Sequence, residues 1–162
     1  MKVHRRAAWT SILAVLTVST SLVADDFLIR LELTHGHLAE LFIGCATGAG
    51  DGYDRGKDDF APPPGIETGY TVLAPPVENL PPLYKDIRAP GKKLTWRLYA
   101  KVFKDKVITV AWDPKALPEG YTFVAETGEE KIDMRKKSEL SCAETRFVTF
   151  TATKRKPKSE TD

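Results

Sequence analysis

The feature that most constrains the fold of this chain is a regular alternation of apolar and polar residues along short segments. In residues 27–33 (FLIRLEL) every second residue is apolar, and Arg30 and Glu32 stand between them. Residues 94–103 (LTWRLYAKVF) begin with the same pattern. Because successive side chains of a β-strand point to opposite faces of the sheet, this period predicts strands with one face in a core.

The same pattern, with glycine and proline between segments, predicts an all-β chain. Strands are expected at residues 27–33, 38–44, 69–74, 94–103, 106–112, 121–125, 131–134 and 146–152, with an edge strand between prolines at 83–88. Two hairpins are expected, one through residues 34–37 and one through a tight turn at Lys104-Asp105. We therefore predict two packed antiparallel sheets of about seven or eight strands, a β-sandwich, with an open barrel as the alternative.

Residues 1–24 have the composition of a secretory signal peptide. Residues 1–6 (MKVHRR) are basic, the stretch that follows is apolar apart from serine and threonine, and a cleavage site precedes Asp25. We predict a signal peptide at 1–24, the sandwich domain at 25–153 and a flexible polar tail at 154–162. The mature protein is expected to be secreted, periplasmic or on the cell surface. An uncleaved membrane anchor is the alternative, although the apolar stretch barely reaches the length of a spanning helix.

The net charge argues against a nucleic-acid partner. The chain has 24 lysine and arginine residues against 22 aspartate and glutamate residues, a formal charge of +2. Three of the basic residues, Lys2, Arg5 and Arg6, lie in the predicted signal peptide, which has no acidic residue. The mature domain is therefore close to neutral and lacks the basic excess typical of nucleic-acid binding.

The chain has two cysteines, Cys45 and Cys142. Export would place both in an oxidising compartment, so a disulfide between them is predicted. On the chain-entropy model it would stabilise the domain by about 4 to 5 kcal/mol at most, because it closes a loop of nearly the whole domain. The alternative is two separately buried thiols, which behave as small apolar side chains.

Residues 51–59 (DGYDRGKDD) are the segment richest in candidate metal ligands. Its four carboxylates belong to Asp51, Asp54, Asp58 and Asp59, and glycines between them allow tight curvature. Carboxylate oxygens in a curved loop are typical ligands of calcium, so we predict Ca²⁺ as the one cofactor, although the spacing is not that of an EF-hand. The alternative is a solvated loop in which the aspartates cap turns and pair with Arg55 and Lys57.

Aromatic residues in the strands have two interpretations. They are Trp96, Tyr99, Trp112, Tyr121 and Phe123. Their alternation favours core and cross-strand packing. The other interpretation is a carbohydrate-binding surface, in which case Tyr99 and Phe103, on the face opposite Trp96, are its expected members.

Several segments resemble the immunoglobulin-like β-sandwich modules of bacterial secreted and cell-surface proteins, which often precede a C-terminal sorting domain. The similarity covers most of residues 27–152. It lies in residues 41–44, 51–58, 62–64, 86–88, Trp96, 110–113, 117–118 and 132–135. The resemblance implies a structural or adhesive module with no catalytic residues. The sequence of residues 1–162 is expected to depart from the family pattern by standing alone, without a larger passenger or a sorting domain.

Together these observations predict a secreted, non-catalytic binding or structural module. The chain lacks a Gly-x-Ser-x-Gly elbow, a glycine-rich phosphate loop and an HExxH motif. Its expected partner is an extracellular protein or glycan, with no membrane contact after signal cleavage. The first alternative is a subunit of an extracellular assembly that pairs through strand edges. A carbohydrate-binding module or a small hydrolase are more distant alternatives.

Overall fold

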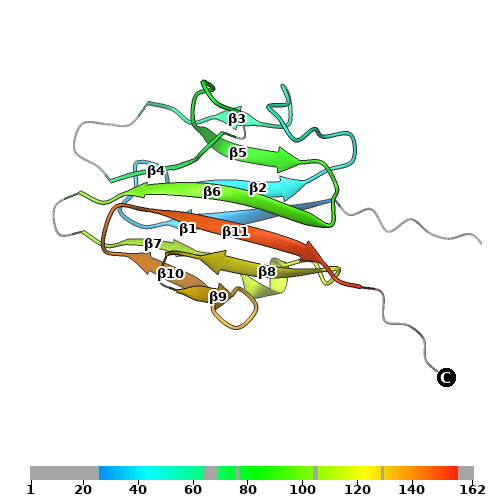
Figure 1. The fold of residues 1–162 in the computed structure, drawn as a ribbon. Helices are drawn as coiled ribbons and strands as arrows, with labels where there is room; N and C mark the ends of the chain where they lie inside the picture. Colours follow the sequence, from blue (N-terminus) through cyan, green and yellow to red (C-terminus); the bar gives the residue numbers. More distant parts are fainter. Residues whose placement is uncertain (1–25, 64–68, 76, 104–105, 129, 157–162) are drawn as a thin grey trace, which may run out of the picture.

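Eleven β-strands and one short 3-10 helix make up the part of the chain that the structure describes, residues 26–63, 69–75, 77–103, 106–128 and 130–156. The structure is a computed structural model (Figure 1). No α-helix occurs among these residues, so the predicted all-β class is confirmed. The elements are β1 (Phe27–Leu33), β2 (Glu40–Cys45), β3 (Asp59–Phe60), β4 (Tyr70–Leu73), β5 (Leu83–Arg88), β6 (Lys93–Lys101), β7 (Ile108–Ala111), η1 (Pro114–Ala116), β8 (Tyr121–Glu126), β9 (Lys131–Asp133), β10 (Glu139–Cys142) and β11 (Arg146–Lys154).

The strands form one continuous sheet that curls into a half-barrel. Their order is β10-β7-β1-β2-β5-β4-β6-β11-β8-β9, with β3 paired to β5 beside this path. The end strands β9 and β10 are not paired with each other in the described part of the chain. All strand pairs are antiparallel except β2 with β5, which run parallel. The predicted antiparallel arrangement is therefore wrong at this pair, because the long connection between β2 and β5 allows a parallel crossover.

Two halves of the curled sheet pack against each other. One half holds β10, β7, β1, β2 and β5, and the other holds β4, β6, β11, β8 and β9. They are joined where Leu73 of β4 and Leu83 of β5 form a single register pair. Figure 1 shows β1 and β2 running behind β6 and β11. Across this space the ring of Phe27 lies 6.2 Å from that of Trp96 and 5.4 Å from that of Tyr121, in edge-on geometry.

The core lies between these halves, on the inner face that the alternation predicts. In β1 the inward residues Ile29, Leu31 and Leu33 are buried, while Arg30 and Glu32 are exposed. The longer strands β6 and β11 alternate in the same way. Each fully buried large apolar side chain contributes about 1.5 to 3 kcal/mol relative to an exposed one, so the inner face accounts for most of the fold's stabilisation.

The first predicted hairpin is confirmed, and the second is wrong. Residues 27–33 pair with β2 as expected. Residues 94–103 and 106–112 do contain strands, but β6 pairs with β4 and β11, whereas β7 pairs with β1 and β10. The chain therefore crosses from one half to the other after β6, and the predicted turn at Lys104-Asp105 lies outside the described residues. Alternation tells which face of a strand is buried and does not identify its neighbour.

Two further strand assignments differ from the prediction. Residues 83–88 were expected at a sheet edge, but β5 lies between β2 and β4, and its flanking prolines stand just outside the ladder. The short strands β3 and β10 were not predicted, because two and four residues are too few to establish a period.

The ends of the domain adjoin the predicted signal peptide and tail. Residues 1–24 lie outside the described residues. The last strand reaches Lys154, and the Arg155 amide donates to the Gly120 carbonyl oxygen at 2.8 Å, so the first residues of the predicted tail belong to the fold. Within the described ranges no helix has the length and apolar character needed to cross a bilayer.

Candidate functional site

Three of the four predicted calcium ligands are engaged with groups of the protein. Asp58 is buried, and its two carboxylate oxygens accept from the backbone amides of Asp54 at 2.6 Å and Ile87 at 2.7 Å. The Asp54 carboxylate accepts from the Gly50 amide. Asp59 Oδ2 forms a 2.8 Å ion pair with the Lys85 ammonium group. These bonds close the aspartate loop, residues 50–59, and fasten it to β5.

The fourth, Asp51, differs from the other three. Its residue is exposed, and its backbone carbonyl accepts from Arg88 Nη1 at 3.2 Å. Across the described residues, no group of three or more histidine, cysteine, aspartate or glutamate side chains is placed to hold a metal ion. A calcium site at these four aspartates stays a prediction, and the observed contacts are those of turn-capping and ion-paired carboxylates.

The two cysteines are buried thiols that are not joined to each other in this structure, and the disulfide stays a prediction. Cys45 pairs with Phe27 at the start of β1, whereas Cys142 pairs with Ile108, beyond the other end of that strand. The seven residues of β1 span about 20 Å, and disulfide formation needs Cα atoms within about 7 Å. Burial also raises the pKa of Cys142, which disfavours its reactive thiolate.

A buried ion pair lies where the aspartate loop meets β5, and sequence reasoning missed it. Asp86 is completely buried, and Arg88 Nη2 contacts its Oδ2 at 2.7 Å. The parallel register places Asp86 beside Ile43 and Arg88 beside Cys45, both core residues. Residues 83–88 were predicted as an edge strand, and the alternation of Asp86, Ile87 and Arg88 does not by itself indicate that both charged side chains are buried.

The environment of Asp86 favours the protonated acid. Burial raises its pKa from 3.8 to about 6, against the opposing attraction of Arg88, and the nearby charge of Asp58 adds to the rise. Asp86 Oδ1 has no hydrogen-bond partner among the described residues. The carboxylate is therefore held in a costly environment that its single cationic neighbour only partly offsets.

This raised pKa predicts that the protein gains stability on mild acidification. The folded state binds a proton to Asp86 between pH 6 and pH 4, where the unfolded chain does not, so the free energy of unfolding rises as pH falls. The contribution of this group is about 2 kcal/mol between pH 7.5 and pH 4. Urea unfolding across this range measures it, with Asp86→Asn as the reference that lacks the titrating group. Parallel profiles for the two proteins would contradict the assignment.

The outer face of the second half carries a row of aromatic rings. Tyr99 of β6 lies opposite Phe147 of β11, with ring centroids 5.0 Å apart, and 6.4 Å from the ring of Tyr70 on β4. The His37 ring lies 4.8 Å from Tyr70. The Arg97 guanidinium lies 4.3 Å from the centroid of the Phe147 ring, a cation–π geometry. We call the outward side chains of β4, β6 and β11 the aromatic face.

Three cations of the aromatic face form no ion pair with a described residue, although Glu126 of β8 lies across Thr149 from Arg97. Lys93, Arg97 and Lys101 are exposed on β6, and no ion pair joins them to a described residue. The outer face of the first half differs, because Arg30 there pairs with Glu40 at 2.6 Å and with Glu32 at 3.4 Å. The charges of the first half are thus largely satisfied within the protein, whereas those of the aromatic face are open to a ligand.

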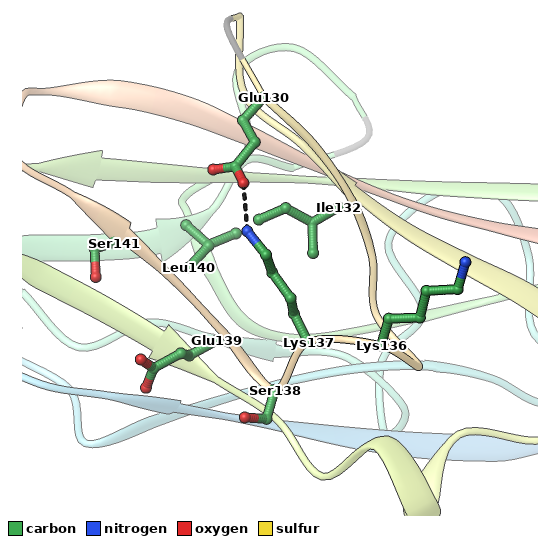
Figure 2. A pocket seen from close by; sticks show the side chains of 8 residues that line it. All are labelled: Glu130, Ile132, Lys136, Lys137, Ser138, Glu139, Leu140 and Ser141. Atoms are coloured by element: carbon green, nitrogen blue, oxygen red, sulfur yellow. Dashed lines mark hydrogen bonds and ion pairs between the residues drawn. The ribbon is translucent and has the colours of Figure 1, made fainter.

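A pocket between the two end strands is closed by a lysine. Figure 2 shows Lys137 extending between Ile132 and Leu140 toward Glu130, whose Oε1 it contacts at 2.6 Å. Beneath it, the Trp112 indole donates to the carbonyl oxygen of Lys137 at 2.9 Å, which holds the turn between β9 and β10. The aliphatic stem of Lys137 therefore lies between two apolar side chains of this otherwise polar pocket.

The core interpretation of the aromatic residues is confirmed for Trp96, Trp112, Tyr121 and Phe123, which are buried. Tyr99 lies on the outer face, as predicted from its position opposite Trp96, and Phe103 is 39% exposed beyond the end of β6. The partners of Tyr99 were missed. Tyr70 and Phe147 lay in predicted strands, but only the pairing of β4 and β11 with β6 brings them together.

No protein-family model, curated protein or solved structure matches this chain. The resemblance to immunoglobulin-like modules therefore stays a prediction. The function is inferred from the contacts, exposure and charge of the aromatic face, the aspartate loop and the strand edges.

Proposed function

We propose that this protein is a secreted, non-catalytic binding module that holds its ligand on the aromatic face. The observation that carries the proposal is the combination of exposed positive charge at Arg97, whose guanidinium lies over the Phe147 ring, with the neighbouring ring of Tyr99. A sheet presents such side chains on a rigid frame, so little conformational entropy is lost on binding. Export is inferred from residues 1–24, and the ligand is an extracellular protein or glycan.

We also propose that the two packed halves act as the two layers of an immunoglobulin-like sandwich. The contacts of Phe27 with Trp96 and Tyr121 support this, as does the single register pair at the β4–β5 junction. In such a sandwich the outer face of one layer can bind a ligand, while the charged side chains on the outer face of the other layer stay paired with each other. Calcium at the aspartate loop is a further proposal, since Asp51 is exposed.

The strand edges favour binding through a face over assembly through edges. The end strands β9 and β10 are three and four residues long. Exposed charged residues, Lys131 and Asp133 on β9 and Glu139 on β10, occupy them. Short, charged edges are a common protection against pairing with another sheet.

A panel of extracellular polysaccharides and surface proteins tests the proposed function. We expect Tyr99→Ala to weaken binding of whichever ligand is recognised by about tenfold, which corresponds to about 1.4 kcal/mol. Leu28→Ala is the matched control, because Leu28 is a 54% exposed apolar residue on the outer face of the other half. Equal loss in both variants, no loss in Tyr99→Ala, or no ligand in the panel would contradict the proposal.

A further inference from the structure

The aromatic face has the charge and shape of a linear track for an anionic chain. Its outward side chains on β4, β6 and β11 include no carboxylate among the described residues. The nine residues of β6 span about 30 Å, and alternate side chains on one face recur about every 7 Å. Lys93, Arg97 and Lys101 therefore lie in line, each about 13 Å from the next.

Of the three cations on this track, Arg97 has the side chain best preorganised to bind an anion. Its guanidinium lies over the Phe147 ring, which limits its rotamers before any ligand arrives. It forms no ion pair with a carboxylate of the described residues. A planar guanidinium with open donors binds a carboxylate or sulfate through two parallel hydrogen bonds.

Hydroxyl groups and rings flank the charges. On β11, Thr149 lies opposite Arg97, and Thr153 lies opposite Lys93. Tyr99 and Tyr70 add apolar ring surface at the Lys101 end, where Tyr70 is the register partner of Lys101. Rings pack against the apolar C–H faces of sugars, and hydroxyl groups exchange hydrogen bonds with sugar hydroxyls.

We infer that the ligand of the aromatic face is an acidic polysaccharide, whose carboxylate or sulfate groups are bound by Arg97, Lys93 and Lys101 while its sugar rings pack on Tyr99 and Tyr70. The inference rests on the proposed function and names its ligand class. A single-stranded nucleic acid fits less well. The rings of Tyr70 and Tyr99 are inclined by 71°, and those of Tyr99 and Phe147 by 43°, so they form no series of parallel platforms for successive bases.

Titration of the purified mature domain with four polymers tests this inference. They are a polyuronate, dextran sulfate, uncharged dextran and single-stranded DNA, each measured by calorimetry at low and high salt. We expect the polyuronate or dextran sulfate to bind at least tenfold more tightly than the other two, and the tighter of the two names the anionic group. The preference should shrink in high salt, because exposed charges are screened.

Charge variants locate the site. Arg97→Gln should weaken binding of the acidic polymer about tenfold, and Lys93→Gln with Lys101→Gln should do the same without touching the stacked guanidinium. Arg30→Gln, an exposed arginine on the other outer face, should leave binding unchanged. Melting temperatures confirm that each variant is folded.

Four results would overturn the inference: equal binding of dextran, tighter binding of DNA, no binding of any polymer, or equal loss in Arg30→Gln. Binding of dextran or of a surface protein that is lost in Tyr99→Ala would overturn the acidic ligand and still support the proposed binding face. If Tyr99→Ala binds every ligand as tightly as the native protein does, the proposal that the aromatic face is the binding site is itself contradicted. The two failures are therefore distinguishable.

Discussion

Replacement of Arg88 by methionine is expected to destabilise the protein by about 3 to 5 kcal/mol at pH 8, because it leaves a buried carboxylate without its partner. Asp86 is completely buried, and the guanidinium of Arg88 contacts it at 2.7 Å. Methionine keeps most of the apolar stem and removes the guanidinium. Chemical unfolding monitored by tryptophan fluorescence measures the loss.

The same change should be less harmful in acid. Arg88 lowers the pKa of Asp86, so its removal raises that pKa further, and the carboxyl group becomes neutral below pH 6. The destabilisation by Arg88→Met should therefore be smaller at pH 5 than at pH 8. A loss that does not depend on pH would indicate lost packing instead of an unpaired charge.

Two further variants separate the charge from the contact. The double change Asp86→Leu with Arg88→Met removes both charges and should be more stable at pH 8 than Arg88→Met alone. Arg30→Met, at an exposed ion pair, should cost less than about 1 kcal/mol. If Arg88→Met also costs less than that, the interior pair is not the constraint that its geometry indicates.

Replacement of Asp58 by alanine is expected to cost about 3 kcal/mol, because two backbone donors lose their acceptor. The amides of Asp54 and Ile87 donate to its two oxygens, and the latter bond is buried. The aspartate loop would lose its internal bond to Asp54 and its bond to Ile87 of β5, while the ion pair of Asp59 with Lys85 would remain. Asp51→Ala, at an exposed residue of the same loop, should change stability by less than about 0.5 kcal/mol.

The same pair of variants tests calcium. If an ion binds Asp51, Asp54, Asp58 and Asp59, the melting temperature of the native protein rises with millimolar calcium and falls with chelator, and Asp51→Ala reduces that response. A melting temperature unaffected by calcium would remove the predicted site. The expected stability loss in Asp58→Ala does not depend on whether calcium binds, because the two amides that donate to Asp58 belong to the protein itself.

Sequence alone predicted strands well and neighbours poorly. Alternation around Trp96 and Ile29 reports burial of one face, and those segments are strands at nearly the predicted residues. Pairing depends on packing between segments far apart in the chain, so the hairpin expected after Phe103 proved to be a crossover between the two halves.

In the candidate site, too, the face on which a residue lies could be predicted, whereas its contacts with other strands could not. Tyr99 could be assigned to the outer face from its position beside Leu98, which points inward. Its contacts with Tyr70 and Phe147 depend on the register of three strands and had no local signal. The aspartates were visible as a cluster, but the Asp58 bond to Ile87 joins residues that only the tertiary fold brings together.

The position of β11 affects how the protein is made. This strand is the last in the chain, yet it lies between β6 and β8 and pairs with both. The ladder around it cannot form until Arg146–Lys154 has left the ribosome, and pairing between such distant segments is slow. The second half of the sheet is therefore completed only after nearly all of the chain has been synthesised, although the hairpin of β1 and β2 can pair much earlier.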